Sequence, residues 1–243
     1  MLSTEEIVEL YNQRRRAQGP VHEQMRRVRE LANGDIIVPL NELDRNAKSS
    51  VANLLVQGLE QMSMRVASTM PSPYFPPMKE GSERSKGNAR MRKKAMLSIW
   101  DHNRMQMKMR RRSRHLLGYS QSAVVLKPDF KTLMPTWSVR NPLDTFAAPV
   151  DDPDNPIPDD CIFSYRVTAS YLMRTYGELV SGRLRMGRVR PDTRYTMLEY
   201  VSPYEIQLVV IGAEDEANLT PAERAGTDAV MVEYIPNRTE MPL

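Results

Sequence analysis

Cysteine and histidine are scarce in this sequence: Cys161 is the single cysteine, and three histidines stand among 243 residues. One cysteine cannot form an internal disulfide or a zinc site built on a cysteine pair, so we expect a reducing compartment. No two histidines have the i, i+4 spacing of metal ligands on a helix. The chain also lacks an apolar run near the roughly 18 residues of a membrane span, and it lacks the basic-then-apolar start of a secretory signal. We therefore expect no disulfide scaffold, no zinc module and no membrane partner.

Motifs for catalysis are missing as well. The chain has no glycine-rich phosphate loop followed by Lys and Ser or Thr, and no GxSxG turn to expose a nucleophilic serine. Cys161 opens the apolar run CIFSY, where a buried small thiol is a better explanation than a nucleophile. We predict no catalytic residue, no cofactor and no metal, and thus a protein that is not an enzyme.

Charge is present in quantity but is unevenly distributed. Up to Ser120 the chain has 22 Lys+Arg against 12 Asp+Glu, and from Gln121 onward it has 12 against 18. Such an asymmetry indicates subunits or faces that meet with opposite sign, or an anionic partner for the first half. Nucleic acid is the commonest partner of a basic stripe.

Helical signals dominate the first half. Ser3 and Glu6 form a capping-box pattern that predicts a helix over 4–17, and Gly19-Pro20 separates it from a helix over 21–32. A third helix is predicted over 49–70, capped by Ser49 or Ser50 and ended by Pro71. Its apolar positions recur at helical spacing and predict one core-facing stripe: Val51, Leu55, Leu59, Met62, Val66 and Met70.

An arginine-rich helix is predicted over 87–117. Its apolar residues suggest a core-facing side made of Met91, Met96, Ile99, Trp100 and Met109. Its basic residues repel one another unless an anion, the acidic residues of a partner or solvent balances their charge. A helix face that is simply exposed to solvent is therefore the alternative to a binding surface. The candidates for contact with nucleic acid or a neighbouring subunit are Arg104, Lys108, Arg110, Arg111, Arg112 and Arg114.

The second half has the patterns of β-strands. Strands are predicted over 122–127, 136–140, 161–166, 195–201, 205–211 and 229–235, with one short helix capped by Thr168. The predicted fold class is α+β: a helical region over 1–120, followed by a mostly antiparallel β region over 121–243.

Two charged loops interrupt the β region. The loop DDPDNPIPDD, residues 151–160, has acids that could hold Mg²⁺ or Ca²⁺, but a solvated turn or a subunit contact is the better explanation. A second basic cluster could follow a phosphate backbone or be a plain exposed loop. It consists of Arg183, Arg185, Arg188 and Arg190.

Four segments, taken in order, resemble portal proteins of tailed bacteriophages, especially the siphovirus portals of phages that infect actinobacteria. They are LANGDIIVPLNELDRN, NAKSSVANLLVQGLEQMSMRVASTMPSPYFPP, MRKKAMLSIWDHNRMQMKMRRRSRHLLGYSQSAVVLKPDF and WSVRNPLDTFAAPVDDPD. The resemblance covers roughly Leu2 to Arg166, the part that builds the wing in this family. The stem, clip and crown of longer relatives would follow Leu243.

The resemblance implies a structural role. Portal proteins form a ring, typically a dodecamer, at one vertex of the capsid in the virion, after assembly in the host cytoplasm. The implied partners are other copies of the chain, the major capsid protein, a head-tail adaptor, the large terminase subunit and double-stranded DNA. The ring is the conduit for DNA packaging and ejection and the head-tail connection.

A different class of function stays open beside this one. The basic helix and the aspartate-rich loop together would also suit a DNA-binding protein or a metal-dependent nuclease.

Overall fold

A computed structural model describes residues 2–34, 54–68, 72–129, 131–150, 157–181, 190–213 and 229–236. The chain forms two compact units. Met1–His22 and Asp144–Leu243 make the first, here called the sheet unit, and Glu23–Leu143 makes the second, here called the helical unit. The boundary predicted at residue 120 falls inside the helical unit.

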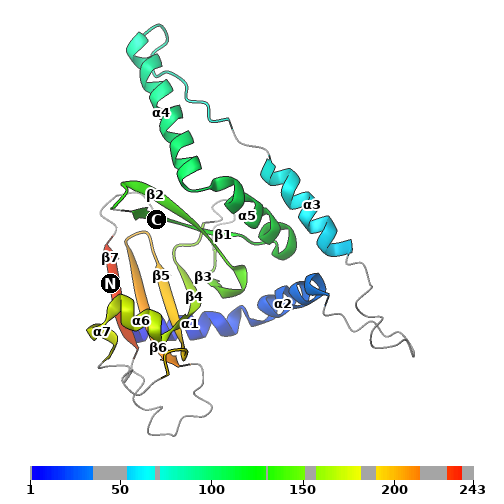
Figure 1. The fold of residues 1–243 in the computed structure, drawn as a ribbon, viewed down its shortest axis with the longest axis vertical. Helices are drawn as coiled ribbons and strands as arrows, with labels where there is room; N and C mark the ends of the chain where they lie inside the picture. The colour runs from blue at the N-terminus through cyan, green and yellow to red at the C-terminus, as the bar shows by residue number, and fades with distance from the viewer. Residues whose placement is uncertain are drawn as a thin grey trace. The chain divides into compact units, whose positions relative to one another are not determined.

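The sheet unit is built on five antiparallel strands in the order β3-β4-β5-β6-β7 (Figure 1). Their bounds are Thr145–Ala147, Cys161–Thr168, Arg194–Val201, Glu205–Ala213 and Val230–Pro236. Each strand pairs with the next one along the chain, which is the simplest connection for an antiparallel sheet. The predicted strands are confirmed, and β3 is an addition that the sequence reasoning missed.

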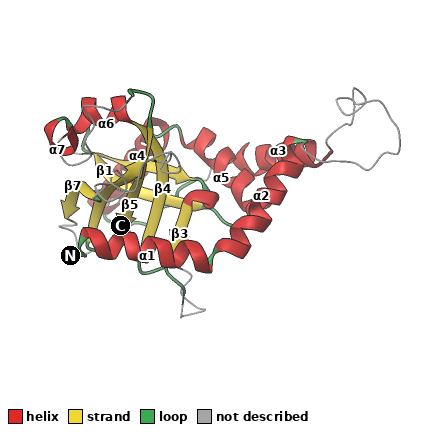
Figure 2. Cartoon of the chain, turned by 90° about the horizontal axis from the view of Figure 1, so that it is seen from below, coloured by secondary structure: helices red, strands yellow, loops and turns green. Residues whose placement is uncertain are grey.

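One face of this sheet is covered by α1 (Thr4–Ala17), which lies across the strands in Figure 2. The predicted capping box is confirmed, since the Glu6 N–H donates to Ser3 Oγ and the Ser3 N–H donates to Glu6 Oε2. Ile7 and Tyr11 are buried against Phe146 and the inward-facing residues of β4 to β6. The ring of Tyr11 meets that of Phe146 edge to face, with centroids 5.0 Å apart.

The other face carries a second core around α6 (Ala169–Tyr176) and α7 (Glu178–Ser181). Leu172 and Val180 are fully buried there with Met197 and Val210 of the sheet. Thr168 caps α6 as predicted, because its hydroxyl accepts a hydrogen bond from the Tyr171 N–H.

The helical unit contains α3 (Leu54–Ser68), α4 (Glu83–His102), α5 (Met105–Tyr119) and the hairpin of β1 (Ala123–Asp129) and β2 (Met134–Arg140). The helix α2 (Gly19–Asn33) crosses the boundary between the units, and a 3-10 turn (Pro142–Asp144) lies at the other boundary. The α+β class is confirmed. None of the described helices is long and apolar enough to span a membrane.

The arginine-rich segment is two helices, and the prediction of one continuous helix over 87–117 is wrong. Asn103 ends α4, and Arg104 adopts the left-handed conformation with φ 50°. A left-handed residue cannot continue a right-handed helix, so the chain turns there before α5 begins.

The predicted apolar stripe of α3 does not form the core of the helical unit. Ser63 and Ala67 are the buried residues of α3, whereas Leu55, Met62 and Val66 are exposed. α3 packs on α5, and the two residues of α3 that are buried have small side chains, which let helices approach closely. The predicted cap at Ser49 or Ser50, Val51, Met70 and Pro71 lie outside the described residues.

The predicted core-facing side of the arginine-rich segment is also partly wrong. No residue of α4 is buried, and Met91 and Met96 are exposed. Ile99, Trp100 and Met109, which lie close to the turn between α4 and α5, are half-buried. The burial of this segment is therefore concentrated around the turn.

Candidate nucleic-acid or subunit interface

The turn between α4 and α5 is held by the buried side chain of Asn103. Its amide nitrogen donates to Ile99 O at 3.0 Å and to Pro135 O at 2.7 Å. Its oxygen accepts from the Trp137 N–H at 2.9 Å and from Lys108 Nζ at 3.2 Å. One amide therefore ties the end of α4, the start of α5 and strand β2 together, which explains why the helix breaks here.

Lys108, predicted as a contact residue, is part of this internal network. Its ammonium donates to Asn103 Oδ1 and to the backbone oxygen of Trp137. Burial lowers the pKa of Lys108 below its ordinary value, because the charged form loses hydration. Its charge fixes α5 on the hairpin, and it is half-buried, so it is the least available of the predicted cations on α5.

Two of the predicted arginines are engaged by Glu60 of α3. Arg110 Nη2 lies 2.6 Å from Glu60 Oε2, and Arg114 Nη1 lies 3.0 Å from Glu60 Oε1. The hydrogen bond from Arg110 lowers the pKa of the Glu60 carboxyl, and the Arg114 charge adds to the effect. One carboxylate thus holds two arginines one helical turn apart and joins α3 to α5.

The remaining cations of α5 and its N-terminus are Arg104, Arg111 and Arg112. All three are exposed, and none makes an ion pair within the described parts of the chain. Free guanidinium groups bind phosphate or carboxylate oxygens with paired N–H donors. These three side chains are therefore the part of the predicted basic surface on α5 and its N-terminus that is available to a partner.

His115 lies on α5 close to the free arginines and was not singled out from the sequence. Burial lowers the pKa of its imidazole, and the positive charge of Arg111 lowers it further. Its Nδ1 atom is buried and has no hydrogen-bond partner among the described residues. No sequence motif marks this residue, because its environment includes the backbone of Arg140 at the end of β2, which lies against α5 in the fold.

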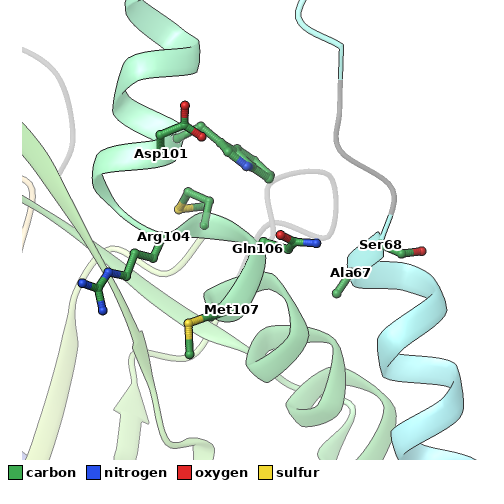
Figure 3. A pocket seen from close by; sticks show the side chains of 8 residues that line it. Ala67, Ser68, Asp101, Arg104, Gln106 and Met107 are labelled. Carbon is green, nitrogen blue, oxygen red and sulfur yellow. The ribbon is translucent and has the colours of Figure 1, made fainter.

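A pocket of about 310 Å³ opens beside the turn, between α3 and the start of α5 (Figure 3). Gln106 lies on the side facing Ala67 and Ser68, while the Arg104 side chain points away from α3. The lining mixes apolar, amide and charged groups and includes no pairing of a nucleophile with a base. It consists of Ala67, Ser68, Trp100, Asp101, Arg104, Met105, Gln106 and Met107.

The other predicted cluster lies in the sheet unit. Arg190 is exposed just before β5, and its backbone oxygen accepts from the Thr193 N–H at 3.1 Å. Arg183, Arg185 and Arg188 lie outside the described residues.

Of the acidic loop over 151–160, residues 157–160 are among the described residues. Asp151, Asp152 and Asp154 lie outside the described residues. Asp160 pairs with Arg14 of α1, and Tyr200 donates to its other oxygen at 3.4 Å. Within the described ranges, no group of three metal-ligating side chains comes together.

The lone cysteine has an environment that suppresses thiol chemistry. Burial raises the pKa of Cys161 to about 12, and the neighbouring Asp160 charge adds to this effect while Arg14 opposes it. The thiol is therefore protonated near neutral pH, and a thiolate nucleophile is not available there.

Comparisons with known protein families and with curated protein sequences find no match to this chain.

Proposed function

We propose that this chain is a structural subunit of a bacteriophage portal ring, contributing the wing region at the capsid vertex. Its work is done by contact with copies of itself, with capsid, adaptor and terminase proteins, and with DNA that passes through the ring. No step of this role requires its side chains to make or break a bond.

The opposite charges of the two compact units carry the proposal. The sheet unit has 12 Lys+Arg against 20 Asp+Glu, a net charge of −8, and the helical unit has 22 against 10, a net charge of +12. A chain with two oppositely charged units suits head-to-tail contacts, in which one unit of each copy meets the other unit of the next. Such contacts close into a ring when the rotation between copies permits.

The ordered segments that resemble portal proteins support the same role. They include α3 and the stretch from the turn between α4 and α5 to the end of α5, which carries the free arginines. Double-stranded DNA that passes through a ring needs a surface that attracts its phosphates without recognising a particular base sequence. Exposed arginines supply this attraction.

Electron-microscope class averages of the purified protein test the proposal. Closed rings with a central opening are the expected particles. Single compact particles at every protein concentration would contradict the proposal.

Duplex binding without a ring is the second candidate, favoured by the three unpaired arginines. A binder that makes about six phosphate contacts should lose on the order of a thousandfold in affinity between low and physiological salt. A conduit should hold short duplexes weakly at either salt concentration. Mg²⁺-dependent cleavage that disappears in Asp151→Ala and Asp154→Ala variants would favour the nuclease form of this candidate.

A further inference from the structure

The helix α4 contributes less to the core of the helical unit than its length would suggest. It has 20 residues, and none of them is buried. Its largest contact with another element is the one with α5. A helix in water gains most of its stability from an apolar face that packs on its neighbours, so a helix with no buried side chain is only marginally stable alone. Most of the surface of α4 is therefore available to a partner.

This exposed helix is strongly basic. It has six Lys+Arg against two Asp+Glu, and the two acids, Glu83 and Asp101, stand near its ends. All six cations are exposed, and the contact of Lys86 with Glu83 at 2.9 Å is the one ion pair that they make among the described residues. That pair is itself on the surface and contributes little to stability. The six cations are Arg84, Lys86, Arg90, Arg92, Lys93 and Lys94.

Four of these cations share one side of the helix, here called the α4 stripe. They have the spacing i, i+4, i+7 and i+8, which places side chains next to one another on a helix, and they are Lys86, Arg90, Lys93 and Lys94. With a rise of 1.5 Å per residue, the stripe is about 12 Å long. Arg84 and Arg92 lie on another side. Like charges at this spacing destabilise a helix, so an anion that lies along the stripe would stabilise α4.

The composition of the α4 stripe favours phosphate groups over an acidic protein surface. Three of its four members are lysines, and Met91, the large apolar residue of this stretch, lies on another side. Protein interfaces are depleted in lysine and have an apolar or aromatic centre. Lysine binds phosphate as a point charge that needs no fixed geometry. Duplex DNA carries one charge per roughly 1.7 Å of its axis, so a stripe of about 12 Å faces enough phosphates for all four cations.

We propose that the α4 stripe binds the phosphate backbone of double-stranded DNA without reading its base sequence. This inference rests on the proposed contact with DNA and names a helix that makes it. On α5, internal partners engage Lys108, Arg110 and Arg114, whereas every member of the α4 stripe except Lys86 lacks an ion pair in the described chain. About four phosphate contacts hold a duplex weakly at physiological salt, which lets the DNA move along the surface.

Fluorescence anisotropy of the full chain with a labelled duplex, measured over a series of salt concentrations, tests the proposal. The stripe variant, Arg90→Gln with Lys94→Gln, removes two charges from the stripe. The control variant, Arg84→Gln with Arg92→Gln, removes the same charge from another side of α4, and glutamine keeps the helix propensity high in both. The stripe variant should bind at least about tenfold more weakly at low salt, and its salt slope should fall by about 2. The control should stay within about threefold of the unchanged protein.

Equal losses in the two variants would overturn the role of the stripe and leave the DNA contact in place. Failure of the unchanged protein to bind the duplex at low salt would overturn both. Loss of self-association in the stripe variant, with unchanged duplex binding, would assign the stripe to an acidic protein surface and also overturn the proposal. Rings formed by the unchanged protein would keep the proposed subunit role in each of these cases.

Amide hydrogen exchange provides a second measurement that locates the contact along the chain. Addition of the duplex should slow exchange within residues 86–97 of α4, because the phosphates remove the repulsion between the cations and stabilise the helix. The stripe variant should show little of this protection, whereas the control variant should keep it. Protection that is confined to other elements of the unchanged protein would overturn the proposal.

Discussion

At the residue scale, Asn103 is the side chain on which the turn between α4 and α5 depends. Asn103→Ala should lower the free energy of unfolding by about 2–4 kcal/mol, because the half-buried Trp137 N–H and Pro135 C=O lose the partner that the buried Asn103 amide provides. Urea unfolding followed by circular dichroism measures this loss. Asn88→Ala, on the exposed surface of α4, is the matched control and should change stability by less than about 0.5 kcal/mol. Similar losses for both variants would refute the role given to Asn103.

His115 should make stability depend on pH near neutrality. Folding lowers the pKa of its imidazole below the ordinary 6.5, so the unfolded chain binds the proton more strongly. Stability is therefore retained above pH 6.5 and declines as the pH falls through this value. Thermal unfolding between pH 7.5 and 5 should show a smaller decline for His115→Gln than for the unchanged protein. The exposed His102→Gln serves as control, and identical pH profiles for all three proteins would rule out the effect.

At the element scale, the backbone of Arg104 sets the break between the two basic helices. Its left-handed φ of 50° suits glycine and is costly for a β-branched residue. Arg104→Val should therefore be less stable than Arg104→Gly by about 1–2 kcal/mol, although both variants remove the same charge. Differential scanning calorimetry of the pair gives this difference directly. Equal stabilities would mean that the turn is not held in that conformation.

Arg110 and Arg112 are close together on α5 but have different expected roles, because Arg110 pairs with Glu60 of α3 and Arg112 makes no ion pair in the described chain. Arg110→Ala should cost about 0.5–1 kcal/mol of stability because it removes a partly exposed pair with Glu60. Arg112→Ala should change stability by less than about 0.5 kcal/mol but should weaken assembly, since Arg112 makes no ion pair in the described chain. Chemical unfolding and sedimentation velocity of both variants provide the two readouts. Undiminished assembly of Arg112→Ala would count against a role for this residue.

Local patterns predict the elements of this chain better than their packing. The capping box at Ser3, the cap at Thr168 and the main strands follow from a few adjacent residues, and they are confirmed. The helix break depends on Asn103 reaching Pro135 and Trp137, which are over 30 residues away.

The candidate site, too, could be predicted only in part from residues that are close together in the sequence. The basic composition of α5 marks it as a contact surface, but composition cannot separate Lys108 and Arg110, which have internal partners, from Arg111 and Arg112. A pocket of the sheet unit could not be predicted from the sequence, since Leu2, Asp159 and Tyr204 of its lining are distant in the chain and come together only in the folded unit.

At the scale of the whole molecule, the account rests on two oppositely charged units within one chain. Ion pairs between exposed groups are screened by salt, so contacts built on them should weaken as ionic strength rises. The exposed apolar residues of α3, among them Leu55, Met62 and Val66, add surface whose burial does not depend on salt in this way. Assembly should therefore be reduced but not abolished at high salt.

Mass photometry of the protein at low concentration tests the central claim most directly. The account predicts a discrete high-mass species at a fixed whole-number multiple of the 27.9 kDa chain, as a closed ring requires. A single peak at the mass of one chain, under low salt and at every concentration, would contradict it.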